Sequence, residues 1–149
     1  GLQSEISPMY LESELRYNGP NLQWYDNYSN GSSRFSDSWS TTTVFGGLGP
    51  LPNGLWTTGE TVSPTWNYRM VVGDADFAVP LQATFDLMGR GGFYIHPDGN
   101  VVGTAGCIGL NGTEARMLNF QNRYDTYYSR HGSISLRVQW ALLYLLLNF

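Results

Sequence analysis

Short segments in which apolar and polar residues alternate make up most of the chain and predict β-strands. Residues 14–17 and 22–25 flank the turn Asn18-Gly19-Pro20-Asn21 and predict a hairpin, because Asn-Gly supplies the positive φ angles of tight turns. The clearest alternation runs from Ser133 to Val138, where every second residue is apolar. Further strands are expected over residues 35–45, 55–58, 67–72 and 91–96, whereas 76–88 is ambiguous because Pro80 interrupts its alternation.

One segment, Thr113 to Arg130, has the character of an amphipathic α-helix. Thr113 is a suitable N-cap, and Gly132 follows the expected end. The apolar stripe of this helix is expected to comprise Ala115, Met117 and Leu118, continued by Asn122 or Tyr124 and then by Tyr127 and Tyr128. The Gly- and Pro-rich run GGLGPLPNG (46–54) predicts a loop. Residues 1–13 carry little pattern and are expected to form a lead-in to a single domain over residues 14–149.

The composition of the 149 residues agrees with one β-rich domain. Eighteen Gly, seven Pro and 22 aromatic residues are typical of a β-fold with many turns. All eight cationic side chains are Arg, and the absence of Lys excludes Schiff-base chemistry and a Walker A lysine. A formal net charge of −4 argues against nucleic acid as a partner. The longest apolar run, Trp140 to Leu147, is much shorter than the roughly 20 residues of a membrane span.

Residues that can carry chemistry gather in the segment RGGFYIHPDGNVVGTAGCIGL (90–110). It holds the only Cys, Cys107, and one of the two His, His96, which together are too few for a dedicated zinc site. A free thiol is only a few per cent thiolate at neutral pH, so a nucleophilic Cys107 needs a base such as His96. Gly106 permits a tight turn, and its amide and that of Cys107 can face a developing oxyanion. A buried apolar Cys and a structural His are the alternative interpretation.

The same segment resembles the active-site signature of the L,D-transpeptidase (YkuD-like) family. In that signature an apolar strand ending in Ile-His is followed by a short excursion and then Ser/Thr-x-Gly-Cys-Ile/Val. The matching residues here are Ile95-His96 and Thr104-Ala105-Gly106-Cys107-Ile108. Over residues 14–138 the chain resembles, more weakly, a compact branch of this family. That branch includes antibacterial effectors exported by type VI secretion systems. The resemblance implies a mainly β, sandwich-like fold with one α-helix after the catalytic Cys.

By this resemblance the chain is a cysteine enzyme that modifies bacterial peptidoglycan. Family members attack the bond between diaminopimelate at position three of a stem peptide and D-Ala at position four. A thioester forms and then passes to an amine or to water. Carried over to this sequence, Cys107 is the nucleophile, His96 is the general base, and Gly106 lines the oxyanion hole. Thr104 occupies the family's Ser/Thr position, which helps to hold the imidazole.

The sequence departs from the family pattern at two positions, with Ala105 where many members have His and Gly109 where most have Arg. The loss of that Arg favours L,D-carboxypeptidase action and D-amino-acid exchange over crosslinking. Arg90 is a candidate replacement as a carboxylate clamp, with a structural ion pair as the alternative. Asp98 is a candidate hydrogen-bond partner of His96 or ligand of a substrate amine, although Pro97-Asp98-Gly99 is also a turn signal.

These observations predict an enzyme that is secreted and acts in the bacterial periplasm as an antibacterial effector. Its expected partners are peptidoglycan stem peptides and a cognate immunity protein, with no cofactor, metal, nucleic acid or membrane span. A resident crosslinking enzyme and a phage lytic factor are the nearer alternatives. A non-catalytic wall-binding module in which Cys107 is merely buried is the more distant one.

Overall fold

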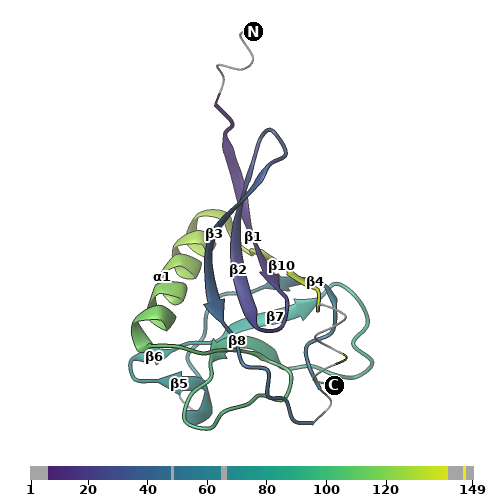
Figure 1. Ribbon diagram of the computed structural model, residues 1–149, viewed down its shortest axis with the longest axis vertical. Helices are drawn as coiled ribbons and strands as arrows, with labels where there is room; N and C mark the ends of the chain where they lie inside the picture. The colour runs from purple at the N-terminus through teal and green to yellow at the C-terminus, as the bar shows by residue number, and fades with distance from the viewer. Residues whose placement is uncertain (1–6, 48, 65–66, 141–145, 147–149) are drawn as a thin grey trace.

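An eight-stranded sheet forms most of the computed structural model, which describes residues 7–47, 49–64, 67–140 and 146 (Figure 1). Its strands are β1 (Tyr10–Tyr17), β2 (Asn21–Tyr28), β3 (Ser33–Ser40), β4 (Gly54–Thr58), β7 (Val79–Ala83), β8 (Phe93–Pro97), β9 (Ile108–Leu110) and β10 (Ser135–Val138). They lie in the order β3-β2-β1-β10-β4-β7-β8-β9. The pairs β1/β10 and β8/β9 are parallel, and all other neighbours are antiparallel.

The two edges of this sheet meet, so the sheet is nearly closed. Thr41, which follows β3, forms a β-bridge with Leu110 of β9. Two further backbone hydrogen bonds join these edges, from Thr42 N–H to the Gly109 carbonyl (2.8 Å) and from Asn111 N–H to the Ser40 carbonyl (2.8 Å). The closure fixes the position of β9, the strand that Cys107 precedes.

The remaining elements are the α-helix α1 (Glu114–His131), the 3-10 helix η2 (Tyr68–Met70), and a small hairpin of β5 (Val71–Val72) and β6 (Ala75–Asp76). As expected, Thr113 caps α1, accepting a hydrogen bond from the Arg116 N–H at 3.2 Å, and Gly132 ends it. The described part of the chain is therefore mainly β with one α-helix, which confirms the fold class at that level. None of its helices combines the length and the apolar character needed to cross a membrane.

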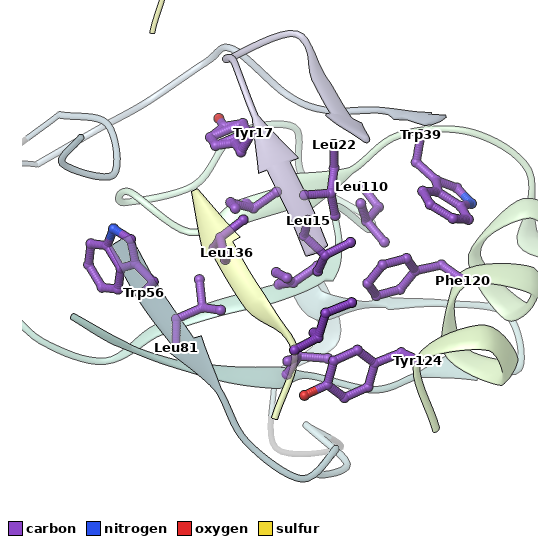
Figure 2. Packing of buried hydrophobic residues seen from close by; sticks show 14 of the residues in the cluster. Leu15, Tyr17, Leu22, Trp39, Trp56, Leu81, Leu110, Phe120, Tyr124 and Leu136 are labelled. Carbon is purple, nitrogen blue, oxygen red and sulfur yellow. The ribbon is translucent and has the colours of Figure 1, made fainter. Parts of the chain in front are cut away.

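The hydrophobic core lies between α1 and the face of the sheet to which the apolar residues of each strand point (Figure 2). On β1 and β10 the alternation buries Leu15, Tyr17, Leu136 and Val138. The helix contributes Met117, Phe120, Tyr124 and Tyr127, spaced three or four residues apart. Aromatic rings make much of this contact, with Phe120 packed edge-on against Trp39 and Tyr127 edge-on against Trp24.

The helical stripe is the first point at which the structure corrects the sequence analysis. Ala115 is exposed and Leu118 is only partly buried, whereas Phe120, which was not expected in the stripe, is fully buried. Turning the helix toward Phe120 buries a large ring instead of a single methyl group, and burial free energy scales with apolar area. The packing of whole rings therefore decides which face is buried.

The strand boundaries give further corrections. Strand β1 begins at Tyr10, so residues 10–13 do not belong to a lead-in. Ser13 is buried in this strand, and its hydroxyl donates a hydrogen bond to Asp26 Oδ1 at 2.7 Å, which lets a polar residue occupy an inward position. The strand expected over 35–45 ends at Ser40, and residues 67–72 form η2 and only a two-residue strand. The hairpin of 14–25 is confirmed, and the strand expected over 133–138 is confirmed from Ser135 to Val138.

Candidate active site

His96 and Cys107 are brought to one face of the sheet by the parallel pairing of β8 with β9. In this register Ile95 is opposite Ile108, and His96 is opposite Gly109. Ile95 and Ile108 are fully buried in the core. Because side chains alternate along a strand, His96 points to the other face. Cys107 precedes Gly109 by two positions and therefore lies on the same face as His96.

On that face both residues line one cavity of about 660 Å³. Its walls are formed by residues 44–47, by residues 101–105, and by Asn67, Arg69 and Met70 at η2. His96 and Cys107 are 11 positions apart, and the segment between them folds back toward β8. The expected nucleophile and the expected base therefore line the same cavity.

The imidazole of His96 is held in one tautomer. Its Nδ1 lies 2.6 Å from the Pro97 carbonyl oxygen. A carbonyl oxygen can only accept, so Nδ1 carries the proton and Nε2 keeps its lone pair. The side chain is 4% exposed, and this burial lowers the pKa of His96, opposed by the Pro97 carbonyl and by the charge of Asp98. His96 is therefore a neutral base at neutral pH.

Cys107 is present as a thiol rather than as a thiolate. Burial raises the pKa of its thiol, with a backbone hydrogen bond from Tyr94 acting in the opposite direction. The Sγ atom lies 3.7 Å from the Gly92 carbonyl oxygen, toward which a thiol can donate. In the resting site both the Cys107 thiol and the His96 imidazole are thus neutral. The proton therefore has to leave Sγ as the sulfur attacks.

The residues just before Cys107 form a tight loop that Thr104 holds together. The Thr104 hydroxyl donates to the Cys107 carbonyl at 2.8 Å and accepts from the Gly106 N–H at 3.3 Å. Gly106 has a φ of +115°, and a Cβ there would lie 2.8 Å from the Phe93 ring. The loop therefore requires glycine at this position.

These bonds correct two expected roles. The hydroxyl of Thr104 holds the loop that carries the nucleophile and not the imidazole. The Gly106 N–H is already engaged by that hydroxyl, so it is not available to an oxyanion in this conformation. The amide of Cys107 is the candidate donor that remains from the sequence analysis.

Asp98 is 7% exposed and acts on His96 through its charge. Its Oδ2 accepts a hydrogen bond from the Gly103 N–H at 3.0 Å, which closes the excursion between β8 and β9. Its Oδ1 is buried and has no hydrogen-bond partner among the described residues. The expected hydrogen bond with the imidazole is wrong, because Nδ1 is used by Pro97, but the negative charge still raises the pKa of His96.

Arg90 precedes β8 and contacts the Gly- and Pro-rich loop. Its guanidinium donates to the carbonyl oxygens of Gly49 (3.1 Å) and Pro50 (3.3 Å), and it lies over the Phe93 ring. It forms no ion pair within the described residues, and it does not line the cavity. The expected ion pair of Arg90 is not found within the described residues, and its contacts tie the Gly- and Pro-rich loop to the start of β8. The clamp for a substrate carboxylate stays a prediction.

Gly109 stands in a space that admits no side chain. A Cβ at this position would lie 2.9 Å from Asp98 Cβ, 2.9 Å from Thr42 Cγ2 and 3.0 Å from Thr104 Cγ2. An arginine, as in the resembling family, does not fit this packing. The departure at Gly109 therefore follows from how closely β9 approaches its neighbours.

Arg69 of η2 and its N-cap Asn67 also line the cavity, although neither was expected at a site. The turn after β8 fixes η2 against the site, because the Gly99 N–H donates to the Arg69 carbonyl at 2.6 Å and the Asn100 amide donates to the Tyr68 carbonyl at 2.7 Å. No local pattern marks these residues, since they lie far upstream in a segment whose composition suggested an ordinary strand.

The arrangement as a whole is suited to acyl transfer. A thiol, a neutral imidazole and the Arg69 cation line one cavity, and His131 lies apart from them at the end of α1, stacked on Tyr127. Comparison with models of protein families, with curated proteins and with solved structures found no match to this chain. The assignment of a function therefore rests on the chemistry of the cavity.

Proposed function

We propose that this chain is a cysteine enzyme of the L,D-transpeptidase type that removes or exchanges the D-Ala at position four of peptidoglycan tetrapeptide stems. One observation carries the proposal. Cys107 and His96 line the same cavity, and the bond of Nδ1 to the Pro97 carbonyl leaves Nε2 as the proton acceptor. The Ile-His and Thr-x-Gly-Cys motifs are the reason for proposing this family. We also propose that the nearly closed sheet is the sandwich-like core of that family.

The first half of the reaction is the formation of a thioester. Sγ of Cys107 attacks the carbonyl carbon at the L-centre of diaminopimelate, and His96 Nε2 takes the thiol proton. The negative charge on the carbonyl oxygen is stabilised by the Cys107 amide. The C–N bond to D-Ala then breaks, and the imidazolium returns the proton to the leaving amine. Free D-Ala departs and the stem remains bound to Sγ.

The second half of the reaction restores the thiol. Water, or the amine of a free D-amino acid, loses a proton to His96 and attacks the thioester carbon. The C–S bond breaks and the proton returns to Sγ. Crosslinking additionally needs a second stem peptide held with its amine in reach of the thioester. Small acceptors have no such requirement, so we propose hydrolysis and exchange as the main outcomes.

The proposed setting is the periplasm of a bacterium, which the enzyme reaches as a secreted antibacterial effector. This part of the proposal follows from the resemblance to the compact effector branch and from the acidic charge. A cognate immunity protein is the proposed macromolecular partner, and peptidoglycan stem peptides are the substrate. A resident crosslinking enzyme is the competing proposal, and the products of the reaction distinguish the two.

The experiment that tests the proposal compares variants on purified tetrapeptide muropeptides. Cys107→Ala and His96→Ala are expected to lower turnover by several orders of magnitude, because such a pair acts as a unit. His131→Ala is the matched control, since this histidine lies at the end of α1 and should leave turnover unchanged. Turnover by Cys107→Ala above a tenth of the wild-type rate would show that the nucleophile is wrongly assigned.

A further inference from the structure

We infer that Arg69 recognises a free carboxylate on the leaving group, so that the cavity selects stems that end in D-Ala over stems whose D-Ala is amide-linked to another peptide. This inference rests on the proposed function, from which it takes the reaction, namely removal or exchange of the D-Ala at position four. It names the feature of the substrate that the site selects, and it assigns that selection to a residue outside the Ile-His to Cys segment.

Arg69 is held firmly at the cavity through its backbone. Its N–H donates to the Asn67 side chain at 3.1 Å, which caps η2, and its carbonyl accepts from the Gly99 N–H at 2.6 Å. Gly99 follows β8 directly, so η2 and the strand that carries His96 are joined by backbone hydrogen bonds. The backbone of Arg69 is thereby tied to the strand that carries His96.

The guanidinium of Arg69 is available to a ligand. Within the described residues Arg69 forms no ion pair, and its guanidinium lies 6.0 Å from the centroid of the Tyr68 ring. By contrast, Arg116 and Arg123 share Asp37, Arg16 pairs with Glu14, and Arg90 binds carbonyl oxygens. Among the described residues that line the cavity Arg69 carries the only permanent charge, and none is Asp or Glu. A carboxylate entering the cavity therefore meets one cation on the cavity wall, and the buried Asp98 beside His96 is not among the lining residues.

The chemistry of the proposed substrate matches this arrangement. In a tetrapeptide stem the leaving group is a single D-Ala, whose carboxylate is one Cα away from the scissile nitrogen. Because Arg69 and Cys107 line the same cavity, we propose that Arg69 binds that carboxylate while Sγ attacks. Val44, Val101 and Val102 are exposed on the remaining walls and can contact the methyl group. A stem crosslinked through its D-Ala presents an amide in place of the carboxylate and loses the ion pair.

The charge of the cavity can be tested without any peptidoglycan activity, because Cys107 is the only thiol. The probes are iodoacetate and iodoacetamide, which alkylate the same sulfur and differ in charge. Arg69→Gln is expected to lower the ratio of the iodoacetate rate to the iodoacetamide rate about threefold to tenfold at low salt. Arg69→Lys should retain most of the ratio, and the control Arg130→Gln, on the exposed end of α1, should not change it. An unchanged ratio in Arg69→Gln would overturn the inference.

The selectivity itself is tested with a tetrapeptide stem ending in D-Ala and the same peptide ending in D-alaninamide. The wild type should prefer the acid, chiefly through KM, and Arg69→Gln should reduce this preference about tenfold. Equal use of both peptides by the wild type would overturn the inference while leaving the proposed function intact. If the wild type cleaves neither peptide but the alkylation ratio responds to Arg69, the proposed function fails and the carboxylate site stands.

Discussion

Replacing Gly109 with alanine should destabilise the fold, although alanine is otherwise a conservative change. The added Cβ would lie 2.9–3.0 Å from carbon atoms of Asp98, Thr42 and Thr104. Carbon atoms in ordinary contact are about 3.5–4.0 Å apart, so these neighbours would have to move. Asp98 is held by the Gly103 N–H, and Thr104 is held by its bonds to Cys107 and Gly106. Relief of the contact therefore disturbs hydrogen bonds of the active-site loop.

The magnitude follows from the known cost of overpacking, which is about 1–3 kcal/mol for an added methyl group in a well-packed site. For a domain of this size a loss of about 2 kcal/mol corresponds to a fall in Tm of roughly 4–8 °C. The assay is thermal unfolding followed by circular dichroism, with urea unfolding as the second measurement. Gly91→Ala is the matched control, because Gly91 does not have a positive φ and a Cβ there would meet no atom within 4 Å.

The control should stay within about 0.5 kcal/mol of the wild type. A Gly109→Ala variant that unfolds at the wild-type temperature would refute the packing argument. It would also remove the explanation for the absence of arginine at this position. A destabilisation shared equally by Gly91→Ala would show that the loss reflects glycine replacement in general rather than the contacts of Gly109.

Three further predictions concern the chemistry of the site. Burial raises the pKa of Cys107 from its ordinary value of 9.0, so at pH 7 at most about 1% is thiolate and the iodoacetamide rate should rise steeply up to pH 9. A rate that is already maximal at pH 6 would instead show a preformed thiolate–imidazolium pair. Asp98→Asn removes a charge that raises the pKa of His96, so the acidic limb of the kcat/KM profile should move to lower pH, and an unmoved limb would contradict this coupling. EDTA should leave turnover unchanged while iodoacetamide abolishes it, since one Cys and two His are too few for a zinc site, and the reverse pattern would indicate a metallopeptidase.

The elements that could be predicted from the sequence are those whose signals are local. The turn at Asn18-Gly19 is sufficient to predict the β1/β2 hairpin, and the Thr113 and Gly132 caps predict the ends of α1 within a residue. The face of the helix that is buried was not predictable to the same extent. Phe120 is selected by its contacts with Trp39 and Phe77, which come from distant parts of the chain.

The candidate site likewise contains residues that the sequence indicated and residues that it did not indicate. The motifs that contain His96 and Cys107 identified both residues as candidates, and the parallel pairing of β8 with β9, which the sequence did not predict, places them at one cavity. The contacts of Arg90 could not be predicted, since its partners are backbone carbonyls of Gly49 and Pro50 and carry no sequence signal. Arg69 enters the cavity only through the contact of η2 with the turn after β8. Residues that reach a site through tertiary packing alone leave no mark in a single sequence.

The proposed function is tested most directly by mass spectrometry of purified muropeptides after incubation with the enzyme. We expect that tetrapeptide stems become tripeptides, that added D-Met appears at position four, and that 3–3 crosslinked dimers remain minor. A digest dominated by 3–3 dimers would contradict hydrolysis and exchange as the main reactions and would favour a crosslinking enzyme. Cleavage within the glycan strand, or between the lactyl group and L-Ala, would contradict the assignment to the L,D-transpeptidase type altogether.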